Sequence, residues 1–167
     1  MTSMLFRRAA VGFAAALLAT SGFAAGPLSV REKVELPVPP EKAWEVIKDF
    51  DGWQNWHPVI ASTEITSGKG NKPGTVRVLT TKDGAKITEK LTHYQPKAFS
   101  YTYVITDSPL PVTDYVSTIQ VKAAKSGSVV YWRSQFKAKE GTADADAIKL
   151  IRGVYTAGLD SLKAKLK

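Results

Sequence analysis

Apolar and polar side chains alternate along most of the chain between residues 28 and 138, which is the pattern of half-buried β-strands. Short turns separate these segments, and Lys82-Asp83-Gly84 contains the strongest hairpin signal among them. Because consecutive strands joined by short turns pair antiparallel, the pattern predicts one antiparallel meander. The expected strands span residues 28–38, 60–66, 75–81, 85–94, 99–106, 112–123 and 129–138.

Two segments show helical spacing instead. Between residues 39 and 52 apolar side chains recur at intervals of three and four, and we expect Asp51-Gly52 to end this first helix. A longer stripe runs from about residue 142 to 166, with aspartates in its first turn and lysines in its last, as the helix dipole prefers. The stripe consists of Ile148, Ile151, Tyr155, Leu159, Leu162 and Leu166.

Alternation also carries one carboxylate toward the core. Glu89 shares a strand face with Ile87 and Leu91, so burial of these two side chains brings Glu89 inward. An unpaired buried carboxylate is expensive, so Glu89 must take a proton, meet a cation or bind water.

Large rings and a few hydroxyl groups occupy the inward positions of the neighbouring strands. An apolar cavity with a few convergent polar groups suits a small molecule, although such rings can equally fill a solid core. The candidate ligand-binding residues are Trp53, Trp56, His57, Glu89, Tyr101, Tyr103, Tyr115, Ser117, Trp132, Ser134 and Phe136.

His57 lies in a short aromatic segment, residues 53–58, that we interpret as a second helical turn capping the cavity. It is expected either to meet a ligand, as a donor or as a general acid or base, or to bond the backbone at a helix end. We expect His93, at the end of a strand, to be exposed. Two histidines this far apart, without carboxylates at ligand spacing, predict no metal site.

Other chemistry is excluded by what the sequence lacks. It contains no cysteine, which excludes thiol catalysis, disulfides and cysteine-based metal centres. It contains no nucleophile elbow, P-loop or dinucleotide-binding glycine motif. We therefore predict no cofactor and assign no catalytic residue.

Residues 1–24 have the pattern of a secretory signal peptide. Arg7 and Arg8 precede an apolar run from Ala9 to Ala19, and small residues follow at the expected cleavage positions. The sequence thus predicts a single mature domain, residues 25–167, in the periplasm, with no stable membrane span after cleavage.

The whole chain carries a net charge of +8, and residues 25–167 retain 21 basic and 15 acidic residues, a net charge of +6. Outside the cytoplasm a nucleic acid is not an expected target. An acidic periplasmic protein or an anionic membrane surface fits this charge better. The lysines are scattered, so a purely solubilising role is the alternative.

The segment Trp44-x-x-Ile47-x-x-Phe50-Asp-x-Trp-x-x-Trp-His-Pro-x-Ile60 resembles the opening of the START-like, or SRPBCC, superfamily. That superfamily includes polyketide cyclase/dehydrase-like proteins, birch-allergen relatives and plant hormone receptors, and the resemblance covers the whole mature chain. It implies an α+β helix-grip fold, in which a curved antiparallel sheet wraps around a long C-terminal helix and encloses a cavity.

The plant hormone receptors provide a more detailed comparison. The positions that line their pocket match His57, Glu89, Tyr103 with Ile105, and Tyr115 with Ser117. Their gating loop is replaced here by an ordinary hairpin at residues 80–84, so receptor function is not carried over.

A closer resemblance rests on four features. They are the signal peptide, the motif Phe-Asp-Gly-Trp-x-x-Trp-His-Pro, and the segments Ser108-Pro-Leu-Pro-Val112 and Gly153-Val-Tyr-x-x-Gly-Leu-Asp-x-Leu162. In these features the chain resembles the MxaD-like periplasmic proteins. That family is associated with bacterial methanol oxidation, as an accessory to the dehydrogenase and its cytochrome partner.

Three functions follow as hypotheses. The first is binding of a small apolar or amphipathic ligand in the cavity. The second is an MxaD-like accessory role, docking an acidic partner in a periplasmic redox system such as that of methanol dehydrogenase. The third is a cyclase- or dehydratase-type enzyme that uses Glu89 or His57. It ranks last because a single inward carboxylate is not a catalytic constellation.

Overall fold

A computed structural model describes residues 27–167, so the predicted signal peptide lies outside the described residues. The fold is α+β and contains seven strands, two α-helices and two single turns of 3₁₀-helix. The strands are β1 (Leu28–Leu36), β2 (Ile60–Ser67), β3 (Val76–Thr81), β4 (Lys86–Gln95), β5 (Ser100–Asp107), β6 (Val112–Ala124) and β7 (Gly127–Ala138). The helices are α1 (Pro40–Ile47) and α2 (Asp144–Lys165), and the 3₁₀ turns are η1 (Trp53–Asn55) and η2 (Pro96–Ala98).

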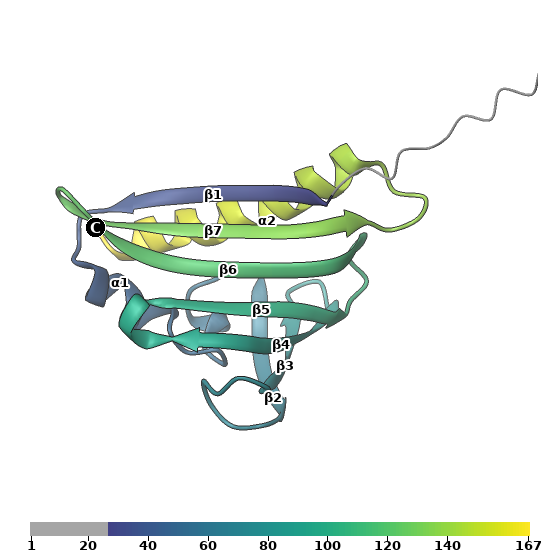
Figure 1. Cartoon of the computed structure of the whole chain (residues 1–167), viewed down its shortest axis with the longest axis horizontal. Helices are drawn as coiled ribbons and strands as arrows, with labels where there is room; N and C mark the ends of the chain where they lie inside the picture. Colours follow the sequence, from purple (N-terminus) through teal and green to yellow (C-terminus); the bar gives the residue numbers. More distant parts are fainter. Residues whose placement is uncertain (1–26) are drawn as a thin grey trace, which may run out of the picture.

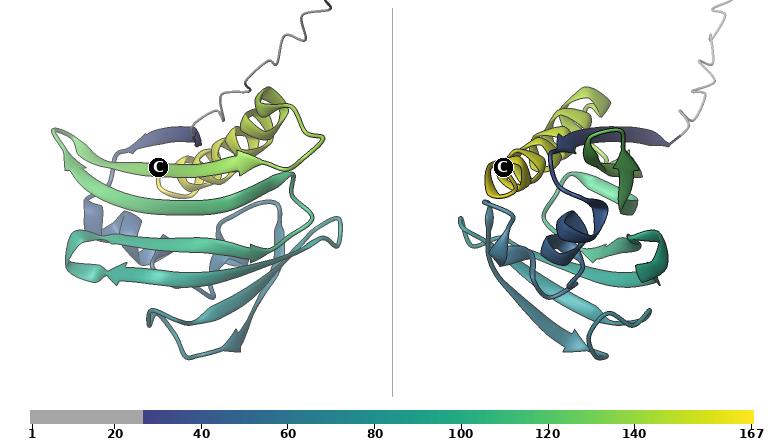
Figure 2. Two further views of the ribbon diagram at one scale, coloured as in Figure 1. Left: turned by 45° about the vertical axis from the view of Figure 1, so that its right-hand side comes forward. Right: turned by 90° about the vertical axis from the view of Figure 1, so that its left-hand side faces the viewer.

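All seven strands form one antiparallel sheet in the order β1-β7-β6-β5-β4-β3-β2. The sheet curls, so that β2 and β3 run steeply across the direction of β6 and β7 (Figure 1). Helix α2 lies along the inner face against β1 and β7, and α1 with η1 covers the space enclosed by the curl (Figure 2). This arrangement confirms the predicted helix-grip fold.

The inner face of the sheet is the one that alternation predicts. Ile87, Glu89 and Leu91 of β4 are all buried, and so is every second residue from Tyr115 to Val121 in β6. His93 on the same strand as Glu89 is exposed, as expected. The ends of the predicted helical stripe, Ile148 in α2 and Leu166 just after it, are only half-buried, while the centre of the stripe is buried.

The first helix is shorter than predicted. It ends at Ile47 rather than at Asp51-Gly52, because tertiary hydrogen bonds replace the helical ones. The amide of Phe50 donates to Asn71 Oδ1 at 2.8 Å, and the Phe50 carbonyl accepts a bond from Arg77. The Phe50 side chain nevertheless reaches the core, where it is completely buried. No helix within residues 27–167 is long and apolar enough to cross a membrane.

Candidate functional site

An internal cavity of about 90 Å³ lies between α2 and the inner face of the sheet. Its wall is mainly apolar and comes from η1, from strands β2 to β7, from the loops after η1 and β5, and from α2. The least buried lining residues are Val59, Thr81, Ile105, Leu110 and Val154, and we take them as the mouth of the cavity. Pockets for drug-sized ligands typically measure about 300–1,000 Å³, so this cavity is small.

Glu89 reaches the cavity wall with a cation beside it. Arg77 of β3 is the direct cross-strand partner of Glu89. It donates from Nε to Glu89 Oε2 at 2.8 Å and from Nη2 to the same oxygen at 2.5 Å. The two side chains are 0% and 4% exposed. Burial raises the pKa of Glu89, and the Arg77 guanidinium opposes that rise. Since a buried arginine keeps its charge, we assign Glu89 as the paired carboxylate.

Aromatic rings enclose this ion pair. The guanidinium of Arg77 lies 3.9 Å from the ring centre of Phe50 and 3.9 Å from that of Trp53, and its third donor binds the Phe50 carbonyl. Cation–π attraction between desolvated groups supports this arrangement. Both bonds from Arg77 to the carboxylate end on Oε2.

A network of neutral groups occupies the other side of the cavity. The Tyr115 and Tyr155 hydroxyls lie 2.5 Å apart, and Tyr155 lies 2.9 Å from Ser117 Oγ. Trp132 Nε1 donates to both Ser117 Oγ and the Tyr103 hydroxyl, each at 3.1 Å. Burial raises the pKa of Tyr155 to about 12 and that of Tyr115 still further above its ordinary value, so these phenols remain protonated at neutral pH.

The donor and acceptor of each hydrogen bond in this network follow from the carbonyl at which the network ends. Ser117 Oγ donates to the Arg133 carbonyl, which can only accept. Tyr155 must then donate to Ser117, and Tyr115 to Tyr155. Tyr103 accepts a bond from Trp132, and a hydrogen bond with Ser117 opposes the rise that burial causes in the Tyr103 pKa. Tyr103 also lines the cavity.

His57 lies between the two polar regions and is 1% exposed. Its ring stacks on Trp53 and meets Trp132 edge-on. Nε2 donates to the Val154 carbonyl of α2 at 3.1 Å, which fixes the proton on that nitrogen. Burial lowers the His57 pKa to about 4, the Val154 carbonyl opposes that change and the Arg77 charge adds to it. Neutral His57 therefore has a bare acceptor at Nδ1, which has no partner within residues 27–167.

A glycine allows this contact between His57 and α2. A Cβ atom at Gly158 would lie 2.7 Å from His57 Cδ2 and 2.8 Å from Trp132 Cζ3, distances that real Cβ atoms do not show. Gly153, one turn and a residue earlier, has nothing within 4 Å of the same position. Gly158 thus serves close packing of the helix on the two rings, whereas Gly153 has no such role.

The cavity separates the predicted ligand-binding residues into two groups. Six line it, namely Trp53, His57, Glu89, Tyr103, Tyr115 and Trp132. The other five are buried beside it without lining it, namely Trp56, Tyr101, Ser117, Ser134 and Phe136. Ser117 acts through the hydroxyl network, and the Tyr101 hydroxyl accepts a bond from Trp53 Nε1 at 3.0 Å.

Sequence reasoning missed two polar members of the site, Arg77 and Tyr155. Arg77 shares a strand face with Leu79, which is the signal that would have placed it inward beside Glu89. Tyr155 belongs to the apolar stripe of α2, and its hydroxyl gains a role only from the strands that it meets. His57 bonds the backbone, as one alternative expected, but at the middle of α2 rather than at a helix end.

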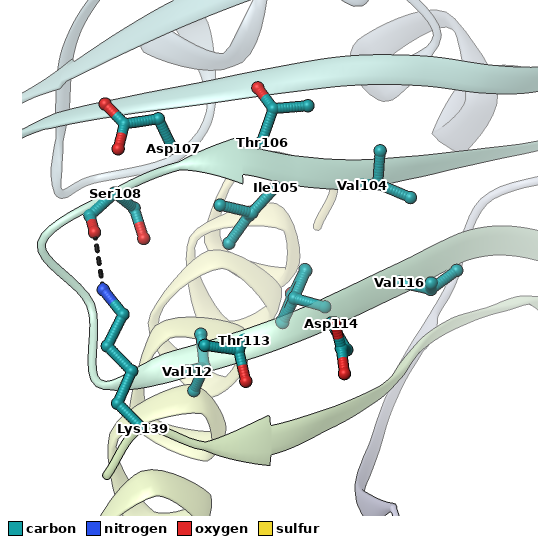
Figure 3. Close-up of a pocket in the computed structure, with 11 residues that line it drawn as sticks. Val104, Ile105, Thr106, Asp107, Ser108, Val112, Thr113, Asp114, Val116 and Lys139 are labelled. Carbon is teal, nitrogen blue, oxygen red and sulfur yellow. Dashed lines mark hydrogen bonds between the residues drawn. The ribbon is translucent and has the colours of Figure 1, made fainter.

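A second, open depression of about 580 Å³ adjoins the mouth of the cavity, where β5 and β6 separate (Figure 3). Their pairing stops at Val104 opposite Val116, so the ends of both strands leave a gap. Ile105 and Tyr115 line both the depression and the cavity. Lys139 holds the connecting loop by donating from Nζ to the Ser108 carbonyl at 2.8 Å.

Residues 27–167, which include the whole sheet, the cavity wall and α2, match the family described as polyketide cyclase / dehydrase and lipid transport. The chain belongs to this polyketide cyclase/dehydrase and lipid transport family. Membership confirms the START-like resemblance, and the match covers every element that builds the site.

Solved structures from bacilli share both fold and sequence with this family member. The protein XoxI from Bacillus cereus is 36% identical, with a TM-score of 0.77 over 83% of this chain and 94% of that one. A putative uncharacterized protein from Bacillus thuringiensis is 35% identical, with the same TM-score over 83% and 98% of the two chains. Ara h 8.0201, at 22% identity and a TM-score of 0.70 over 84% and 98%, shows the same fold.

Among curated proteins, an uncharacterized protein of Mycobacterium tuberculosis is 27% identical over 109 residues. The aligned part spans 64% of this chain and 64% of the mycobacterial protein, which is less than two thirds of that relative's length.

Proposed function

We propose that this polyketide cyclase/dehydrase and lipid transport family member binds a small apolar or amphipathic molecule in the cavity beneath α2. The observation that carries the proposal is an apolar cavity whose wall includes the buried side chain of His57, with its unpaired acceptor Nδ1. We further propose that binding takes place in the periplasm, after removal of residues 1–24. The family description, which includes lipid transport, supports the ligand class.

The polar atoms of the wall define the ligand more closely. His57 Nδ1 offers a bare lone pair. An unpaired buried polar group costs about 1–3 kcal/mol, so a ligand that pairs with this atom recovers that cost. The preferred ligand therefore carries a donor such as a hydroxyl, and otherwise apolar surface.

The volume limits how this ligand fits. A cavity of about 90 Å³ holds a fragment of a few heavy atoms, so a larger ligand requires movement of the wall. The part best placed to move is the loop between β5 and β6, because Leu110 closes the mouth and the open depression lies directly beside it. We propose this end as the route of access, with Ile105 and Tyr115 as the partition.

The first test is native mass spectrometry of the protein purified from periplasm, followed by denaturation and extraction. A co-purifying molecule of small mass, released on denaturation, is the expected result. Titration with 1-anilinonaphthalene-8-sulfonate, an amphipathic fluorescent probe, supplies a test that does not depend on co-purification. A natural chain that carries no molecule and does not bind the probe contradicts the proposal.

Two substitutions on one helix make the test specific. Val154→Phe places a ring at the cavity mouth, while Leu150→Phe adds the same ring at an exposed position of α2 that does not line the cavity. Val154→Phe is expected to weaken probe binding at least about tenfold, the effect of losing roughly 1.4 kcal/mol. Equal affinities of the two variants, both folded by circular dichroism, would place binding outside the cavity.

The catalytic alternative has less support from the geometry. Glu89 is held as a carboxylate by Arg77, and burial lowers the pKa of His57 to about 4, so its free nitrogen is a weak base at neutral pH. A general acid or base must reach a proton on the substrate at about the operating pH. The site therefore favours binding over proton transfer.

A further inference from the structure

The outer face of the sheet carries a second candidate site, unrelated to the cavity. In Figure 1 helix α2 lies behind β1 and β7, so the outer face is turned toward the viewer. Three depressions of about 510, 340 and 250 Å³ lie on this face, and Arg133 lines all three. We name the largest of them the basic hollow, lined by Arg31, Glu32, Lys33, Gln120, Lys122, Tyr131, Trp132 and Arg133.

Two like charges of the basic hollow lie directly opposite each other, which lowers the stability of the sheet. Arg31 of β1 is the direct cross-strand partner of Arg133 of β7, and both are exposed. Like charges directly opposite each other destabilise a sheet. Within residues 27–167 neither arginine forms a salt bridge, in contrast to Arg77 and Arg152.

The acidic residues of β1 do not relieve this repulsion. Glu32 also lines the hollow, but its carboxylate is already paired, since it accepts a bond from Arg152 Nε of α2 at 2.9 Å. Glu35 lies 3.7 Å from Lys33, at the border of the hollow. The hollow therefore keeps an excess of positive charge that an external anion can neutralise.

The shape and the residue types favour a protein partner. Arginine forks fit carboxylates with two parallel hydrogen bonds, and arginine and tyrosine are the residues enriched at protein interfaces. Tyr131 is 38% exposed, with Lys122 Nζ 5.8 Å from its ring centre. An acidic chain segment can present several carboxylates to the two arginine forks, which is why we favour a protein as the occupant.

We propose that the basic hollow binds an acidic segment of a protein partner. The acidic partner expected from the net charge of the sequence thereby gains a defined docking face. This face is the opposite side of the sheet from the cavity, so a partner can dock while the cavity is occupied. Binding of a partner at this face does not depend on ligand binding in the cavity.

The test uses a fluorescein-labelled oligo-glutamate peptide and fluorescence anisotropy on the purified chain. Arg31→Gln/Arg133→Gln removes two charges from the hollow, while Lys163→Gln/Lys167→Gln removes two exposed charges from the end of α2. The expected result is an affinity loss of at least about tenfold for the arginine variant and less than about twofold for the lysine variant. Binding by the natural chain is also expected to weaken as salt is added.

A stability measurement guards against a trivial loss of folding. Because the arginine variant relieves a like-charge contact, its urea midpoint is expected to be equal to or above that of the natural chain. Equal affinity losses in the two variants would show that net charge alone attracts the peptide, and would overturn the proposal. Failure of the natural chain to bind the peptide would do the same, as would tighter, arginine-dependent binding to phosphatidylglycerol vesicles or single-stranded DNA.

Discussion

Two polar regions lie on the same inner face of the sheet, and their buried polar groups are paired in different ways. On β3 and β4, Arg77 and Glu89 form an ion pair enclosed by rings. On β6 and α2, neutral hydroxyl groups are linked by consecutive hydrogen bonds from Tyr115 to Tyr155 to Ser117, and the last bond ends at a backbone carbonyl. Both regions contribute to the cavity wall, through Glu89 and through the two tyrosines.

The difference is in what each region tolerates. Removing one partner of a buried ion pair leaves a bare charge, which costs far more than the pair contributes. Removing one hydroxyl of a neutral chain leaves at most one unsatisfied group, at a smaller cost. The ionic region should therefore behave as a fixed part of the fold, whereas the hydroxyl region can exchange partners with a ligand.

The largest effect is expected for Glu89→Gln, which leaves the buried charge of Arg77 without its carboxylate. The free energy of unfolding should fall by about 3–5 kcal/mol, as measured by urea denaturation at pH 7. The double variant Arg77→Met/Glu89→Leu, which removes both charges, should be the more stable of the two. A single variant as stable as the natural chain would show that the pair is not buried in solution.

A smaller effect is expected from pH, through His57 between the two regions. The folded pKa of about 4 lies below the ordinary 6.5, so the unfolded chain binds the proton more tightly. Stability is then complete above pH 6.5 and is lost as the pH falls to about 4, by about 3 kcal/mol in total. Urea denaturation at a series of pH values measures this slope.

Two variants isolate the His57 contribution. Burial also raises the pKa of Glu89, so this group lowers the stability as the pH rises above the ordinary pKa of a carboxyl. The change of stability with pH in the natural chain therefore combines the effects of His57 and Glu89. His57→Gln keeps a donor for Val154 and should remove most of the loss of stability at low pH, while exposed His93→Gln should leave it unchanged. An unchanged slope in His57→Gln would be evidence against a buried neutral imidazole.

The two glycines of α2 provide the next comparison. Gly158→Ala should destabilise the protein by about 1–3 kcal/mol, because the new Cβ meets two rigid rings at less than 3 Å. Gly153→Ala, in open space on the same helix, should stabilise it by up to about 1 kcal/mol. Thermal unfolding followed by circular dichroism measures both. The same sign for both would mean that α2 does not pack closely on His57 and Trp132.

The smallest effect is expected for Tyr115→Phe, which removes the first donor of the hydroxyl chain. Since Tyr155 keeps its bond to Ser117, the cost should be about 1 kcal/mol in urea denaturation. Tyr131→Phe, on the outer face, should change stability by less than that. A loss for Tyr115→Phe as large as that for Glu89→Gln would contradict the distinction between the two regions.

The sequence alone determined the order of the elements and the face of each strand that turns inward. Alternation fixes side-chain direction within a strand, so Glu89, Tyr103, Tyr115 and Trp132 could be placed inward without coordinates. Helical spacing located α2 for the same local reason. The end of α1 escaped prediction, because the bond from Phe50 to Asn71 joins residues 21 positions apart.

Only the tertiary structure decided which inward residues meet and how much space remains between them. Strand register places Arg77 against Glu89, and the seating of α2 brings Val154 to His57 and Tyr155 to Ser117. The curl of the sheet then leaves a cavity of about 90 Å³ that six of the eleven predicted residues line. Periodicity describes the direction of a side chain relative to its own strand, whereas a contact across the cavity depends on the curvature of the whole sheet and the position of the helix that closes it.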